Sequence, residues 1–233
     1  MSLKRLPQAL LGHLLSGRLF RGTDSDWDHV RQVEYEAILA DARSQGEELM
    51  GDIRDSGFLT ASTEYRDRDG DPLIIITGQY VDPLSFSRDI LRQYVYLTAE
   101  HHGLARKPFS VLFIHTGTTI RNNSPGLSWL WRSWERLPAG LHANLKRCYI
   151  LHADWVLRGG LSLGAPKELY EKICYVARIE YLADHVHPDT DLDAILPPFV
   201  LHHDDILEEH PLFDYGVLDV SRIMPGSPLN PPL

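Results

Sequence analysis

The sequence predicts an α/β fold in which helices flank a mainly parallel sheet. Three apolar runs of strand length, at residues 73–77, 109–115 and 147–151, alternate with segments of helical periodicity. The runs are rich in β-branched and aromatic residues, which is typical of strands buried on both faces. Like strands joined by a crossover helix are most simply parallel, and their crossover is right-handed. The order strand, helix, strand, helix, strand therefore favours a layered α/β domain.

Composition limits the possible classes of protein. The 233 residues suffice for a full hydrophobic core, and 43% of them are hydrophobic and 24% charged, as in ordinary globular proteins. The net charge of -9 argues against nucleic-acid binding, which needs a concentrated basic face. No apolar run approaches the ~18 residues of a membrane span. We expect a cytoplasmic protein or one that is peripheral on an intracellular assembly.

The N-terminal arm, residues 1–23, is basic and amphipathic. Its first 22 residues contain Lys4, Arg5, Arg18 and Arg21 and no acidic residue. One interpretation is an arm that binds a partner protein or packs on its own domain, and this is the one we favour. The alternative is a mitochondrial presequence, which has the same composition.

Residues 24–66 are predicted to form an N-terminal helical segment. Residues 27–45 keep a helical period, with Asp24 or Ser25 as a cap and Gly46 as a stop. A weaker helical piece follows to residue 53, and the charged residues 66–70 form a turn. After the strand at 73–77, a long helix is expected at 83–102, with Pro83 in its first turn.

The crossover between the strands at 109–115 and 147–151 is predicted to be a helix. Residues 122–125 cap and start it, and an apolar stripe follows at spacings of three and four. The stripe consists of Leu127, Leu130, Trp131, Trp134 and Leu137. Beyond residue 152, Gly159, Gly160 and Gly164 are expected to break regular helix and to give either a mobile lid or a simple loop.

The C-terminal part is predicted to lose regular structure. Residues 166–171 and 180–183 read as helices and 172–176 as a fourth short strand, but Pro197 and Pro198 open an acidic, histidine-bearing piece expected to be extended. The domain is placed at residues 67–207. The tail, 208–233, is proline-rich and cannot fold alone. Both tails are therefore expected to be held by other protein subunits.

The sequence contains none of the phosphate-binding and metalloprotease motifs GxxxxGK[ST], GxGxxG and HExxH. The chain has twelve histidines, and several of them cluster, but adjacent histidines of an extended chain point to opposite sides. Cys148 and Cys174 fit no zinc or redox motif. We expect no metal, no cofactor and two buried free thiols. His115 and His152 end central strands where ligands of open α/β sheets bind. With no nucleophile or orienting carboxylate identifiable beside them, a structural or ligand-contacting role is favoured over catalysis.

Several separated segments, in order, carry a family resemblance. They are the Asp69, Gly70, Pro72 turn, the strand end at Ile114, His115 and Thr116, the helix LSWLWRSWERLP, the segment NLKRCYILHADW and the segment LPPFVLHHDD. From Gly70 to about Asp205 the chain resembles the CRAL-TRIO lipid-binding family. It is most similar to the divergent branch with the BCH domains of Rho GTPase-activating proteins and the C-terminal domain of ganglioside-induced differentiation-associated protein 2.

The resemblance implies a sheet that floors an apolar pocket under a mobile helix near residues 155–170. Residues expected to line that pocket are Phe113, His115, Thr116, His152, Trp155, Leu157 and Leu161. The branch is associated with protein partners, including small GTPases, as much as with lipid transfer. We therefore expect a non-catalytic CRAL-TRIO-like interaction module that serves as an adaptor or subunit of a larger assembly. The alternative is a lipid-binding or lipid-transfer protein whose pocket holds a phospholipid or another apolar ligand.

Overall fold

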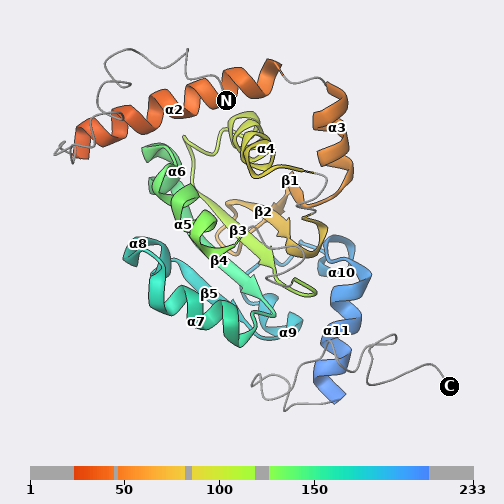
Figure 1. The fold of residues 1–233 in the computed structure, drawn as a ribbon. Helices are drawn as coiled ribbons and strands as arrows, with labels where there is room; N and C mark the ends of the chain where they lie inside the picture. Colours follow the sequence, from red (N-terminus) through yellow and green to blue (C-terminus); the bar gives the residue numbers. More distant parts are fainter. Residues whose placement is uncertain (1–23, 45–46, 82–85, 119–125, 210–233) are drawn as a thin grey trace.

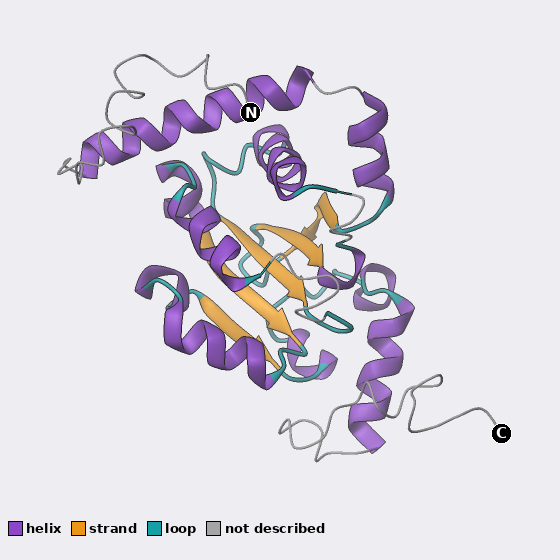
Figure 2. Cartoon of the chain, in the orientation of Figure 1, coloured by secondary structure: helices purple, strands orange, loops and turns teal. Residues whose placement is uncertain are grey.

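A computed structural model describes residues 24–44, 47–81, 86–118 and 126–209. Within these residues the centre of the molecule is a five-stranded sheet in the order β1-β2-β3-β4-β5 (Figures 1 and 2). The strands are β1 (Leu59–Arg66), β2 (Pro72–Thr77), β3 (Phe109–Ile114), β4 (Leu145–Leu151) and β5 (Ile173–Val176). Strands β2 to β5 are parallel and β1 is antiparallel to β2. The predicted α/β fold with a mainly parallel sheet is confirmed.

Two layers of helices cover the sheet because side chains alternate along each strand. Ile74 points to the face that is covered by α4 (Arg88–His101), α5 (Leu127–Glu135) and α6 (Ala139–Asn144). On the same face α7 (Trp155–Gly164) packs over β4 and β5. Leu73 and Ile75 point to the other face, covered by α9 (Ile179–Leu182), α10 (Leu192–Ile195) and α11 (Pro198–Glu209). Both faces of the sheet are therefore buried.

The N-terminal helices form an outer layer. Helix α2 (Asp24–Ser44) lies on the side of α4 away from the sheet, and α3 (Glu47–Asp55) follows it (Figure 1). The rings of Tyr35 on α2 and Tyr96 on α4 have centroids 4.9 Å apart. The short elements η2 (Gly78–Tyr80) and α8 (Lys167–Tyr170) complete the described structure. Both helices expected between residues 27 and 53 are present.

Strand β1 was not expected within residues 24–66, which were predicted to form an N-terminal helical segment. Its sequence, LTASTEYR, alternates weakly and becomes a strand by pairing with β2, where Leu59 is opposite Ile76. The pairing shifts register between Ala61 and Arg66, as is common in edge strands. Pairing with a neighbouring strand is a tertiary contact that local sequence does not report.

Helices α7 and α11 correct two further expectations. In α7 the glycines do not interrupt the helix. The Asp154 side chain caps the helix by accepting a hydrogen bond from the Leu157 amide at 2.7 Å. Leu157 and Leu161, on the inner face of the helix, are buried against the sheet. The segment expected to be extended after Pro197 is helix α11. Its Pro198 occupies the first turn, where a missing N–H costs nothing, and Val200 and Leu207 are buried seven residues apart on one face.

Helix α4 begins at Arg88, later than the expected residue 83. The Ser87 hydroxyl caps it by accepting from the Ile90 amide at 3.3 Å. The expected caps at 122–125 and both tails lie outside the described residues, so the boundaries of the arm and tail stay predictions. None of the described helices has the length and apolar character that crossing a bilayer requires. Cys148 and Cys174 are free thiols on paired strands.

Candidate functional site

The carboxyl ends of β3 and β4 bring together three residues that the sequence analysis singled out. Ile114 and Leu151, the last residues of the two strands, are partners in the parallel register. His115 and Thr116 therefore leave β3 beside His152, which leaves β4. His152 has a φ of 55°, a left-handed conformation that is uncommon for a residue with a side chain.

A hydrogen-bonded chain runs from Thr116 through His152 to Asp204. Thr116 Oγ1 lies 2.7 Å from His152 Nδ1, and His152 Nε2 lies 3.0 Å from Asp204 Oδ1. Asp204 Oδ1 also accepts hydrogen bonds from the Ile179 amide at 3.0 Å and from Arg178 Nε at 3.3 Å. Neither the hydroxyl nor the carboxylate beside His152 was identifiable from the sequence, because Asp204 reaches His152 from α11.

The order hydroxyl, imidazole, carboxylate is that of a catalytic triad, but the burial of the three groups fits a structural clamp. Thr116 is only 2% exposed and the His152 side chain only 1%, so a substrate has no route to the hydroxyl. Burial raises the pKa of Asp204, yet the hydrogen bonds from His152 and Ile179 bring the pKa below its ordinary value. The carboxylate thus stays charged and holds α11 and α9 to the end of the sheet.

Two more histidines border this clamp. The His203 ring lies 4.8 Å from that of His152, and burial, followed by the nearby His152, lowers the pKa of His203 to about 4. His115 is 7% exposed, and its Nε2 lies 3.4 Å from Oδ2 of Asp154, the residue that caps α7. The edge of the sheet is therefore tied to α7 on one side and to α11 on the other.

The apolar part of the expected pocket is packed with side chains. Leu157 and Leu161 of α7 are buried in one cluster with Ile150 and Ala153, and partly buried side chains pack against it. These partly buried residues are Phe113, Cys148, Ala165, Ile173 and Tyr175. Trp155, which was expected to line the pocket, instead lies on the outer surface and is 69% exposed. The seven expected lining residues thus divide among the α7 cluster, the polar edge and the surface.

The outer face of α7 exposes two large apolar side chains in one row. Trp155, Gly159 and Leu163 follow one another at intervals of four residues, so they lie along the same side of the helix. Leu163 is 92% exposed. Gly159 has no side chain, and no other atom lies within 4 Å of the position where its Cβ atom would be. A gap in the row therefore separates Trp155 from Leu163.

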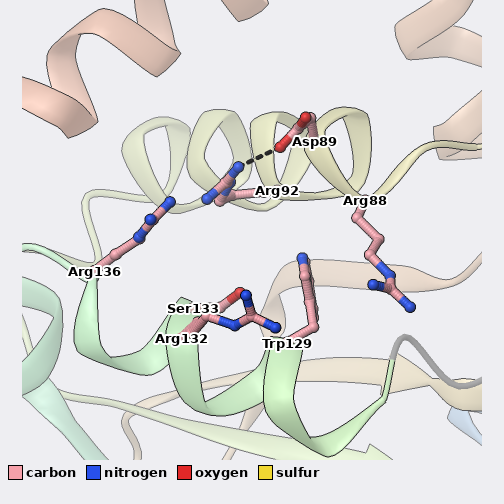
Figure 3. Close-up of a pocket in the computed structure, with 7 residues that line it drawn as sticks. All are labelled: Arg88, Asp89, Arg92, Trp129, Arg132, Ser133 and Arg136. Atoms are coloured by element: carbon pink, nitrogen blue, oxygen red, sulfur yellow. Dashed lines mark hydrogen bonds and ion pairs between the residues drawn. The ribbon is translucent and has the colours of Figure 1, made fainter. Parts of the chain in front are cut away.

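A pocket of about 240 Å³ between α4 and α5 was not foreseen from the sequence. In Figure 3 Arg88 and Trp129 extend into the space between the two helices, whereas Asp89 lies on the side of α4 away from α5. The lining consists of Arg88, Asp89, Arg92, Trp129, Arg132, Ser133 and Arg136. Arg92 pairs with Asp89, and Arg136 Nη1 lies 3.3 Å from Oε1 of Glu34. The signal in the sequence was two pairs of arginines four residues apart, one in each helix.

The expected partner-binding residues Lys4, Arg5, Arg18 and Arg21 lie outside the described residues. Among the residues that are described, no three histidine, cysteine, aspartate or glutamate side chains gather closely enough to hold a metal ion.

Comparisons with known proteins agree with this fold. The family model of the divergent CRAL/TRIO domain matches residues 70–205. Caytaxin from Macaca fascicularis is 25% identical over 104 residues, which are 45% of this chain and 26% of that protein, and Caytaxin from Mus musculus is 24% identical over the same shares. Protein prune homolog 2 from Xenopus tropicalis is 27% identical over 94 residues, 39% of this chain and 29% of that protein. The match thus spans between a quarter and a third of the length of these relatives. The similarity to the caytaxins supports the BCH-like branch, and the family match shows that this chain belongs to the divergent CRAL/TRIO family.

Proposed function

We propose that this chain is a non-catalytic binding module, an adaptor or subunit of a protein assembly, and that a partner protein docks on the outer face of α7. The observation that carries the proposal is the exposure of Trp155 and Leu163, at 69% and 92%, on a helix whose opposite face is fully packed. Exposed tryptophan is a frequent anchor of protein interfaces. The similarity to the caytaxins, BCH-domain proteins, supports the same role.

The extent of the exposed row favours a protein over a small ligand. Tyr170 of α8 is 42% exposed, and its hydroxyl lies 3.4 Å from the Ser162 hydroxyl of α7. An exposed aromatic side chain therefore lies beside Ser162, the residue before Leu163. Because Gly159 has no side chain, the middle of the row is a gap where a helix or strand of a partner can approach the α7 backbone closely.

A crosslinking experiment in cells tests this role. A photoreactive residue in place of Leu163 is expected to capture one partner protein that the same residue in place of Glu180, an exposed position on α9, does not capture. The captured protein is then purified and titrated with the chain. Leu163→Glu is expected to weaken binding at least about tenfold, as the loss of a central apolar anchor does. Equal capture at both positions, or unchanged affinity of the variant, would contradict the proposal.

A second candidate function is lipid binding, which one observation favours. Helix α7 covers apolar side chains of the sheet, Phe113 and Ile150 among them, so its displacement would expose an apolar floor to a ligand. Mass spectrometry of an organic extract of the purified chain tests this role. A lipid present in about equimolar amount supports it. An extract without lipid, from protein prepared without detergent, together with no uptake from labelled vesicles, would remove it.

A further inference from the structure

We propose that the pocket between α4 and α5 binds a ligand that carries at least two phosphate groups. The inference concerns a different set of residues from the outer face of α7 and does not depend on the function proposed above. It rests on four arginines that two separate helices direct into one pocket of about 240 Å³.

The geometry of the helices places these arginines as two facing pairs. Arg88 and Arg92 are four residues apart on α4. Arg132 lies on α5, and Arg136, four residues later, is the residue that caps the carboxyl end of α5. Residues at this spacing lie on one side of a helix, with their Cβ atoms roughly 6 Å apart. Figure 3 shows both pairs at the space between the helices, with the indole nitrogen of Trp129 pointing toward α4. The pocket thus presents cations on both walls.

The arrangement is electrostatically unfavourable without an anion. Like charges at this spacing destabilise a helix, and here two such pairs face each other. Four arginines against the single Asp89 give the lining a formal charge of +3, in a chain whose net charge is -9. A local excess of this sign within an acidic protein concentrates anions at one place.

The chemistry of the lining selects phosphate among anions. A guanidinium group offers parallel N–H donors that match two oxygens of one phosphate, and four groups on two walls can serve more than one phosphate. Ser133 adds a hydroxyl, and Trp129 adds an indole N–H and an aromatic face. The volume lies just below the ~300 Å³ at which pockets for drug-sized molecules begin, so a diphosphate or triphosphate group fills it.

The ion pairs already present leave the site competent to bind. Arg136 is 51% exposed and its pair with Glu34 is open to solvent, so it is a weak competitor. Asp89 is 65% exposed where it pairs with Arg92. Within the described part of the chain, the guanidinium of Arg88 has no carboxylate within ion-pair distance. Among the described residues of the lining, Asp89 is the one acidic side chain, and its charge opposes the ligand.

Phosphate groups in such a pocket have two sources, a soluble phosphorylated metabolite or the headgroup of a phosphorylated lipid. Isothermal titration calorimetry of the full chain with sodium tripolyphosphate and with a nucleoside triphosphate tests the first. Flotation with phosphatidylcholine vesicles that contain a phosphatidylinositol bisphosphate tests the second, with phosphatidylserine vesicles of equal charge as reference. Saturable one-to-one binding in either arm, lost when the pocket arginines are changed, supports the site and identifies the source.

Three variants, each checked by thermal unfolding, make the test specific. The double change Arg88→Gln and Arg132→Gln is expected to weaken binding at least about tenfold, since two charge-assisted contacts are lost. The double change Arg106→Gln and Lys107→Gln removes the same charge from the exposed turn after α4. It is expected to change the affinity less than about twofold, because salt screens exposed charges that lie away from the pocket. Asp89→Asn is expected to tighten binding about threefold, because it removes the opposing carboxylate.

Three results would overturn the inference. The first is the lack of saturable binding to tripolyphosphate, nucleoside triphosphate and bisphosphate vesicles at ~50 mM salt, where surface electrostatics are strongest. The second is an equal loss of affinity in the Arg106 and Lys107 double variant, which would reduce the effect to net charge. The third is binding of a phosphorylated peptide in the absence of binding to any of these probes.

Discussion

The imidazole Nε2 of His152 lies 3.0 Å from Oδ1 of Asp204, which stands 52 residues later in the chain. This contact joins the end of β4 to α11, and the same carboxylate oxygen accepts from the Ile179 amide at the start of α9. One partly buried carboxylate thus attaches two helices of one layer to the carboxyl edge of the sheet. The stability of that layer should depend on Asp204 far more than on its neighbours.

Asp204→Ala is expected to destabilise the fold by about 2–3 kcal/mol, because His152, Arg178 and a backbone amide each lose one hydrogen-bond acceptor. Urea denaturation measures the change. Asp205→Ala, at the exposed next position of α11, is the control and is expected to cost less than about 0.5 kcal/mol. Similar losses for the two variants would show that the contact does not hold the layer.

The buried His203 is expected to make the protein less stable as the pH falls from about 6.5 to 4. Its pKa in the folded protein is about 4, lowered by burial, whereas the unfolded chain has the ordinary value. The unfolded state therefore takes up the proton first and is stabilised relative to the folded state. The free energy of unfolding falls over this interval by at most about 1.4 kcal/mol per pH unit. His203→Gln should flatten the slope of unfolding free energy against pH. An unchanged slope would assign the pH dependence to other groups.

Two glycines of α7 are expected to respond in opposite directions to alanine. Gly159→Ala should stabilise the protein by about 0.5–1 kcal/mol, since the methyl group meets nothing within 4 Å and glycine is a poor residue inside a helix. Gly164→Ala should destabilise it by about 1–3 kcal/mol, because its Cβ would lie 2.5 Å from Cη2 of Trp131 on α5. Thermal unfolding of the two variants measures both, and a shift of the same sign in both would contradict the packing of α7 on α5.

Asp67 is expected to be the most sensitive polar residue at the start of the domain. It is 2% exposed, and its carboxylate accepts from the Ser110 hydroxyl at 2.7 Å and from the amides of Asp69 and Asp71. Asp67→Ala should cost about 3 kcal/mol, because two amides of the β1–β2 turn and the Ser110 hydroxyl of β3 lose their partner.

Asp69→Ala is the control for Asp67. Its side chain is exposed and pairs with Lys146 at the surface, so little change in urea denaturation is expected. A loss as large as that of Asp67→Ala would show that the turn depends on its surface charges instead.

Much of the fold followed from local pattern. The apolar runs at 73–77, 109–115 and 147–151 became β2, β3 and β4, because a continuous run of β-branched and aromatic residues has few other ways to be buried. The weakly patterned β1 and the helix α11 were missed. Strand β1 depends on its neighbour for hydrogen bonds, and α11 depends on the sheet face for burial of Val200 and Leu207. Neither partner is visible in a local window of sequence.

The candidate sites show the same division. From the sequence alone came the placement of His115 and His152 at the carboxyl ends of neighbouring parallel strands, since strand order and length determine where such residues emerge. Only the tertiary structure decided that Asp204 meets His152, that Trp155 faces outward, and that the arginines of α4 and α5 line one pocket. These relations depend on how separate helices pack on the sheet, and packing is set by contacts between residues far apart in the chain.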